Sequence, residues 1–368
     1  MKKLYFFLAT GLAFVILVAA NRTSKNPYGF LKGTPEIKSI SALAFGPDGI
    51  LFIGDSKSAT IFAVDTKDNS PAKAAAVEIK NIDQKIAAAL GTEVKNIRIQ
   101  DIAVNPVSKK IYCVVQNVDG TPALLTIDKD KVQAVSLKDV MFSSASISNA
   151  PAEDQKDRGG RSLRESSISD LEFADGSVMV SGLSNQEFSS TFRKINFPFT
   201  DKQDHATLEI FHAAHGKYET NAPIRTFTTA ELNGKKYLVA SYTCTPLVLF
   251  PLDELKAGKH VKGRTIAEMG SGNSPIDIVS VQKGGNNYLL MANSNRPVFK
   301  VKYKSIEGFA GSLTEPLTES FATAGVDFVS LPTVNVMQMT KMDDAMVLVL
   351  QRRANGDLDL WTISDRYI

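Results

Sequence analysis

Residues 40–65 read ISALAFGPDGILFIGDSKSATIFAVD, three short apolar segments separated first by a turn and then by a polar corner. The Pro47-Asp48-Gly49 triplet supplies the glycine that a tight hairpin requires. Apolar segments of this length with turn signals between them are typical of β-strands. We therefore predict an inner strand at residues 40–45, a second at 51–54, a third at 60–64 and an outer strand at 74–79.

The same pattern returns in weaker form five more times, at residues 99–128, 168–197, 224–252, 276–303 and 334–365. A repeat of this size indicates an array of small sheets that bury their faces against one another. Closing the array into a ring leaves few free strand edges. The prediction is one all-β domain, a six-bladed β-propeller with four-stranded blades, and seven blades are the lesser alternative. Because the sixth unit lacks an outer strand, residues 26–32 are expected to supply it and close the ring.

Unit one also resembles the blades of a known group of propellers. Its residues Phe45-x-Pro47-Asp48-Gly49-x-Leu51, followed by Gly54-Asp55 and Ile61-x-x-x-Asp65, are similar to the NHL, YVTN and SMP-30/gluconolactonase-like β-propellers. The resemblance implies a propeller over nearly the whole mature chain. It also implies a catalytic cation at the channel mouth, as in the SMP-30 and paraoxonase-like families. Their metal-binding glutamate near the first inner strand has no match, because this chain has Ile40-Ser41-Ala42 there.

The N-terminal residues have the pattern of a signal peptide. Lys2 and Lys3 precede an apolar stretch at residues 4–18, and Val18-Ala19-Ala20 is a small-residue cleavage site. We predict cleavage of residues 1–20 and a mature domain over residues 21–368, periplasmic or secreted, with no membrane span. An uncleaved N-terminal anchor is the alternative, although the stretch is short for a spanning helix.

The composition is that of an ordinary soluble protein, with 43% hydrophobic and 22% charged residues. A net charge of +3, two units of which lie in the predicted signal peptide, gives no general attraction to nucleic acid or anionic membrane. No P-loop, GxGxxG, CxxCH or GxSxG motif is present, which argues against nucleotide, haem and serine-hydrolase functions.

Two insertions interrupt the repeat, and both are expected on one face of the disc. Residues 143–166 are polar and glycine-bearing, which predicts a mobile loop. Residues 80–98 contain the pattern of a short helix, IDQKIAAALGTEV. Cys113 and Cys244 fall two units apart, too far for a disulfide, so neither is expected to be bridged.

The start of each inner strand points at the axis of a propeller. Alignment of the units by their apolar pattern places six residues there: Ala42, Asp101, Asp170, Arg225, Asp277 and Asn335. The carboxylates and the Asn335 amide offer the oxygen ligands that Ca²⁺ requires. Alternatively, Arg225 replaces the cation by pairing with Asp170 and Asp277, which leaves a water-filled, salt-bridged channel without catalysis. The second interpretation is the one we favour.

A second candidate site lies at the mouth of unit four. Residues 211–219 read FHAAHGKYE, and the corner at residues 242–246 reads YTCTP. His212, His215 and Cys244 thereby converge, and imidazole with thiolate suits Zn²⁺ or copper. His and Cys could equally act as base and nucleophile. The commoner alternative is that the two histidines only hydrogen-bond loop backbone.

The leading functional hypothesis is a binding module that takes a small-molecule or protein ligand on its loop face, where arginines can grip a carboxylate, phosphate or sulfate group. The residues expected to bind this ligand are Tyr218, Glu219, Arg225, Asn293, Arg296 and Arg352. A first alternative is a Ca²⁺- or other divalent-metal-dependent hydrolase of the lactonase type, with His212 or His215 shuttling the proton. A second alternative is zinc or copper binding by His212, His215 and Cys244.

Overall fold

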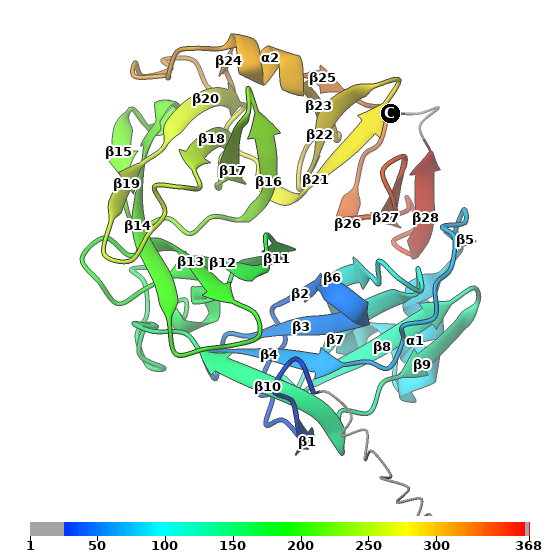
Figure 1. Ribbon diagram of the computed structural model, residues 1–368. Coiled ribbons are helices and arrows are strands. Elements are labelled where there is room, and N and C mark those ends of the chain that lie inside the picture. Colours follow the sequence, from blue (N-terminus) through cyan, green and yellow to red (C-terminus); the bar gives the residue numbers. More distant parts are fainter. Residues whose placement is uncertain (1–25, 365–367) are drawn as a thin grey trace, which may run out of the picture.

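The computed structural model describes residues 26–364 and 368, and it shows six sheets arranged radially around a central channel (Figure 1). Strands make up 48% of the chain and helices 8%, which confirms the all-β, six-bladed propeller. The predicted signal peptide lies outside the described residues. In the part that is described, no helix has the length and apolarity needed to cross a membrane.

We number the blades by the order of their inner strands along the chain. Blade 1 contains β2 (Ala42–Phe45), β3 (Ile50–Asp55), β4 (Thr60–Asp65) and β10 (Val140–Ser146). Blade 2 contains β6 (Ile97–Val104), β7 (Ile111–Asn117), β8 (Pro122–Asp128) and β9 (Lys131–Ala134). Blade 3 contains β11 (Asp170–Ala174), β12 (Ser177–Leu183), β13 (Ser190–Asn196) and β14 (Gln203–His212).

The second half of the ring follows the same plan. Blade 4 contains β16 (Thr226–Leu232), β17 (Lys235–Ser241), β18 (Pro246–Pro251) and β20 (Arg264–Met269). Blade 5 contains β21 (Pro275–Lys283), β22 (Asn286–Asn293), β23 (Phe299–Lys302) and β25 (Val329–Ser330). Blade 6 contains β26 (Val336–Lys341), β27 (Met346–Arg352), β28 (Leu358–Ser364) and β5 (Glu78–Ile79). The outer edges carry β1 (Leu31–Gly33), β15 (Lys217–Glu219), β19 (His260–Lys262) and β24 (Thr323–Gly325).

The first hairpin forms as its sequence predicts. Asp48 and Gly49 adopt positive φ angles of 55° and 72° in the turn between β2 and β3. A Cβ on Gly49 would come within 2.6 Å of the Asp68 carbonyl oxygen, so this position requires glycine both for its conformation and for space. The inner three strands of blade 1 therefore follow from local sequence.

The outer strand of blade 1 is a correction to the prediction. β10 pairs with β4, with Phe142 opposite Val64 and Ser146 opposite Thr60, so residues 74–79 are not the outer strand. This pairing also removes residues 143–146 from the predicted loop at 143–166. Residues 140–146 read VMFSSAS, and the last four lack the apolar alternation that predicts a strand.

The strand that closes the ring also differs from the prediction. β5 pairs with β28, with Ile79 opposite Leu360 and Glu78 opposite Trp361, and thus completes blade 6. The prediction that residues 26–32 close the ring is wrong, because β1 instead pairs with β10 as an extra strand outside blade 1. The chain then enters α1 (Ile82–Leu90), which confirms the predicted helix within residues 80–98. This helix buries Ile82 and Ile86 and ends at Gly91, whose φ is 65°.

As a result, the blades do not follow one another around the ring in chain order. Blade 2 lies between blades 6 and 1: Val104 packs in one core with Ile79 and Leu350, and Val114 packs in another with Leu43. Blade 1 contacts blade 3 on its other face, and blades 3, 4, 5 and 6 then follow in sequence. Six apolar cores thus separate six blades.

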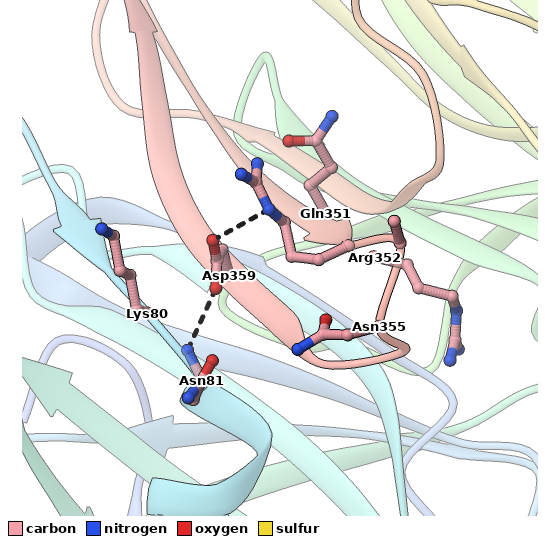
Figure 2. Close-up of a pocket in the computed structure, with 8 residues that line it drawn as sticks. Lys80, Asn81, Gln351, Arg352, Asn355 and Asp359 are labelled. Atoms are coloured by element: carbon pink, nitrogen blue, oxygen red, sulfur yellow. Dashed lines mark hydrogen bonds and ion pairs between the residues drawn. The ribbon is translucent and has the colours of Figure 1, made fainter.

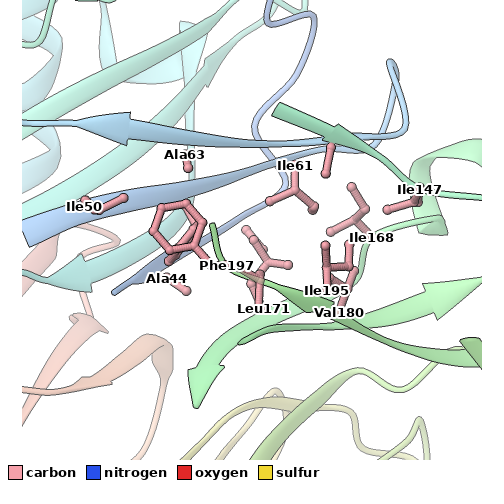
Figure 3. Packing of buried hydrophobic residues seen from close by; sticks show 14 of the residues in the cluster. Ala44, Ile50, Ile61, Ala63, Ile147, Ile168, Leu171, Val180, Ile195 and Phe197 are labelled. Carbon is pink, nitrogen blue, oxygen red and sulfur yellow. The ribbon is translucent and has the colours of Figure 1, made fainter. Parts of the chain in front are cut away.

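The core between blades 1 and 3 shows how the faces fit (Figure 3). Ile61 of blade 1 lies toward Val180 and Ile195 of blade 3, and Ile50 of blade 1 lies on the Phe197 side of the same core. Ile50, Ile61, Val180 and Ile195 are all at most 2% exposed. Full burial of one such side chain contributes roughly 1.5–3 kcal/mol. Interdigitated side chains of this kind hold each blade at a fixed angle to the next and so fix the loops that they carry.

The closing strand can be tested by truncating one side chain. We expect Ile79→Ala to lower the free energy of unfolding by about 2–4 kcal/mol, because the side chain is 4% exposed between blades 2 and 6. The matched control is Leu31→Ala in β1, where the side chain is 73% exposed and the expected change is within about 0.5 kcal/mol. Urea unfolding measures both, and a larger loss in the β1 variant would contradict this account of closure.

Candidate functional site

The β14–β15 hairpin forms one part of the site at the mouth of blade 4. β14 ends at His212, a single 3-10 turn covers Ala213–His215, and β15 then runs back along β14 with Glu219 opposite Ile210. Gly216, with φ 63°, makes the reversal possible. The hairpin folds His212, His215 and Glu219 onto one another, although they span eight residues of sequence.

Glu219 holds both histidines. Its Oε2 accepts a hydrogen bond from Nδ1 of His212 at 3.0 Å, and its Oε1 accepts one from Nδ1 of His215 at 2.8 Å. Burial alone would raise the pKa of Glu219, but the two histidines outweigh it and lower the pKa to about 2. An ionised carboxylate only accepts hydrogen bonds, so both Nδ1 atoms carry a proton, which leaves the two Nε2 atoms as the nitrogens available to a metal ion.

Cys244 comes from the corner between β17 and β18. Cys244 and Thr245 both have positive φ angles, 69° and 58°, a conformation that residues other than glycine rarely adopt. Hydrogen bonds hold this corner: the Cys244 N–H donates to the Asn273 carbonyl at 2.7 Å, and the buried Thr245 hydroxyl donates to the Gly270 carbonyl at 2.9 Å. Strain of this kind concentrates at functional sites.

The structure brings the three predicted ligands together. One atom each of His212, His215 and Cys244 lies within 4.8 Å of the other two, and no other such group of three is found in the described part of the chain. Zinc binds imidazole nitrogen at about 2.0–2.1 Å and thiolate sulfur at about 2.3 Å, so small side-chain movements would bring all three onto one ion. Two imidazoles and one thiolate also suit copper.

Glu268 is a neighbour that the sequence analysis did not identify. It lies in β20, its side chain is 0% exposed, and its Oε1 is 3.9 Å from Nε2 of His212. Burial raises the pKa of this carboxyl, against the effect of the nearby His212. The available signal was a single glutamate within the otherwise apolar strand segment TIAEM of residues 265–269, which is unusual for a strand buried on both faces.

The channel aspartates do converge on the axis. Asp101, Asp170 and Asp277 line a central cavity of about 690 Å³, together with Glu172. Each aspartate accepts a backbone N–H from the inner strand of the next blade: Leu43 for Asp101, Phe227 for Asp170 and Met339 for Asp277. These carboxylates therefore link neighbouring blades.

Arg225 and Asn335 do not belong to this ring. The positions that match the aspartates are occupied by Thr226, whose hydroxyl accepts the Ile278 N–H, and by Gln338, which donates to the Gln100 carbonyl. Asn335 is exposed before β26. Arg225 is exposed directly before β16, and although the charge of Asp170 acts on it, no ion pair joins it to Asp170 or Asp277 among the described residues.

The remaining residues predicted to bind a ligand do not form one pocket. Asn293 is buried and structural, because its amide donates to the Met291 and Pro297 carbonyls. Arg296 stacks over the Phe321 ring at 5.8 Å, and exposed Tyr218 lies under the Lys262 ammonium at 5.5 Å. With Arg225 on blade 4 and Arg352 on blade 6, these side chains are spread over several blades.

Arg352 lines a separate, basic pocket of about 550 Å³ where blade 6 meets α1 (Figure 2). Asp359 lies at its centre, accepting the Asn81 N–H at 3.0 Å and pairing with Arg353 at 3.3 Å. These contacts fasten the start of α1 to β28, next to the closing strand β5. The contacts of Asp359 thus stabilise the closure of the ring.

No protein-family model matches this chain, and no curated protein matches it. Solved structures similar to it include the crystal structure of the mitotic checkpoint complex, at 9% identity over 99% of this chain and 100% of that chain, with a TM-score of 0.39. Another is the PQQ-bound aldose sugar dehydrogenase from Streptomyces coelicolor, at 11% identity over 92% and 99%, with a TM-score of 0.30. Similarity at this level carries no argument about function, and the resemblance to the NHL and SMP-30 propellers stays a prediction.

The channel carboxyls predict a pH dependence of stability. Burial raises the pKa of Asp101 and of Asp170 to about 7, and burial with the charges of these two raises the pKa of Asp277. An unfolded aspartate has a pKa of about 3.9, so between about pH 4 and 7 the folded protein binds more protons. Stability should therefore fall as the pH rises through this window.

The free energy of unfolding at pH 5 and at pH 8 can be measured by urea unfolding. We expect Asp170→Asn to reduce the loss of this free energy between the two pH values by on the order of 1–3 kcal/mol. Asparagine keeps an oxygen for the Phe227 N–H but does not ionise. Asp175→Asn is the control, because Asp175 is exposed in the turn between β11 and β12 and pairs with Lys236. An equal decline in wild type and Asp170→Asn would contradict the assignment.

Proposed function

We propose that this six-bladed propeller binds a transition metal ion, zinc or copper, through His212 Nε2, His215 Nε2 and Cys244 Sγ. The observation that carries the proposal is the contact of Glu219 with both Nδ1 atoms. Metal-binding histidines commonly donate their second nitrogen to a carboxylate, which fixes the tautomer and aims the ring. One carboxylate orients two imidazoles in this way here, and the strained Cys244 corner faces them.

Access to the site supports a binding role. The His215 side chain is 39% exposed and Cys244 is half-buried, whereas His212 is 1% exposed beneath them. An ion at this position would be held from below by the blade and would face the loop side of the disc. A metal ion could therefore reach the site from solvent. The signal-peptide pattern supports an exported location, where such a site would meet extracytoplasmic metal.

The channel gives less support to a calcium-dependent hydrolase of the lactonase type. Its aspartate oxygens already accept backbone N–H groups, and Asn335 lies outside the ring. Carboxylates that link neighbouring strands in this way have a structural role. The binding role is therefore proposed for the mouth of blade 4.

Metal analysis tests this proposal directly. Protein purified without added metal, then loaded and passed through a desalting column, should hold about one zinc or copper ion per chain. His215→Ala and Cys244→Ser should each lower the metal affinity by at least roughly 100-fold, because each removes one of three ligands. His260→Ala is the control, since His260 is a surface histidine paired with Glu209 on the edge of blade 3.

The proposal fails if wild type binds neither metal, or if the two ligand variants bind as tightly as the His260→Ala control. Stoichiometric calcium that Asp170→Asn removes would instead favour the channel as the metal site.

Glu219→Gln tests the orienting carboxylate. The amide cannot accept hydrogen bonds from both histidines with two oxygens, so the imidazoles lose their fixed tautomer, and metal affinity should fall about 10–100-fold. Isothermal titration with zinc measures the change. Glu209→Gln, which alters the equivalent contact with His260, should leave metal affinity unaltered. Equal affinities of the two variants would show that Glu219 does not orient the ligands.

A further inference from the structure

Three buried polar atoms of residues at the mouth of blade 4 have no hydrogen-bond partner: Oη of Tyr242, Nε2 of His212 and Oε2 of Glu268. The last two belong to side chains that approach each other. Leaving a buried donor or acceptor unsatisfied costs about 1–3 kcal/mol each, and more for a charged group. Two such atoms in one place indicate a missing partner between them.

Direct contact between these two groups does not satisfy them. The nearest approach is 3.9 Å, from His212 Nε2 to Glu268 Oε1, which is too long for a hydrogen bond. Nδ1 of His212 already donates to Glu219, which leaves Nε2 as the nitrogen that faces Glu268. A cation between Nε2 and the free Oε2 of Glu268 would satisfy both atoms once the Glu268 side chain moves closer, because Glu268 lies outside the group of His212, His215 and Cys244 donors within 4.8 Å of one another.

The other oxygen of Glu268 fixes the carboxylate in place. Oε1 accepts the backbone N–H of Ala213 at 2.8 Å and that of Ala214 at 3.3 Å. These two residues begin the 3-10 turn that carries His215. Glu268 is thus held against the same turn as two of the ligands, and it stands on the buried side of the site while Cys244 and His215 stand on the solvent side.

We propose that Glu268 is a fourth ligand, and that the ion bound by His212, His215 and Cys244 is a four-coordinate zinc ion. This inference rests on the proposed function. Thiolate, imidazole and carboxylate are all zinc ligands, and four protein donors form a closed tetrahedral site. A hard carboxylate oxygen favours zinc over monovalent copper, which prefers sulfur. The site would join the exit of blade 3 to two strands of blade 4.

Cobalt substitution and zinc competition test the ligand. In Glu268→Gln, zinc affinity measured against a chromophoric chelator should fall at least about tenfold, and the visible bands of the cobalt form should weaken as water enters and coordination rises. The sulfur-to-cobalt charge-transfer band from Cys244 should persist and show that the rest of the site is assembled. Glu231→Gln, an exposed glutamate on β16 of the same blade, is the matched control. Unchanged affinity and cobalt bands in Glu268→Gln would overturn the inference.

A measurement on the wild-type protein covers the case in which Glu268→Gln does not fold. Azide replaces metal-bound water, so it should leave the cobalt spectrum of a site with four protein ligands unchanged. A saturable spectral change with azide would show an open position and would overturn the inference. If the wild type and His215→Ala both take up no zinc or cobalt, the proposed function itself fails. If the wild type binds zinc, a loss of zinc affinity in Glu268→Gln but not in Glu231→Gln supports Glu268 as the fourth ligand.

Discussion

The pairing of β5 with β28 is the interaction on which the rest of the structure depends. A propeller blade is apolar on both faces, so each blade needs a neighbour on each side, and an open ring would leave two faces in water. Only two residues, Glu78 and Ile79, form this closing strand. Ile79 compensates for the shortness of the strand by packing into the core between blades 2 and 6, and α1 covers the same junction through Ile82 and Ile86.

The candidate metal site depends on one of the six cores. Its histidines leave blade 3 at the end of β14, whereas Cys244 and Glu268 belong to blade 4, so the packing between these blades sets the separation of the ligands. Phe192 and Leu208 of blade 3 and Phe227 and Leu238 of blade 4 are all at most 3% exposed in that core. Close-packed interiors transmit small displacements, and a site assembled across this junction is therefore sensitive to substitutions in the core beneath it.

Local features of the sequence were sufficient for the hairpins and for the convergence of His212, His215 and Cys244, because residues 211–219 connect blade 3 to blade 4 and so pass the corner of blade 4 that carries Cys244. Long-range pairing was not predictable: β5 has only two residues, and both β10 and β5 pair with strands that are distant in the chain. The ring of channel residues was misaligned for a different reason. Register shifts at residues 99–101, 275–278 and 336–338 interrupt three inner strands, so these strands do not share one spacing, and Asn335 falls three residues before Gln338. Glu268 was missed because its strand reads as core.

The chain order of the blades has a consequence for synthesis. Val77 and Thr362, which hydrogen-bond beside the closing strand, are 285 residues apart, so the ribosome releases almost the whole chain before this contact can form. Until Val140–Ser146 emerge, the edge of β4 has no partner either. The nascent chain would therefore carry two unpaired strand edges until late in translation.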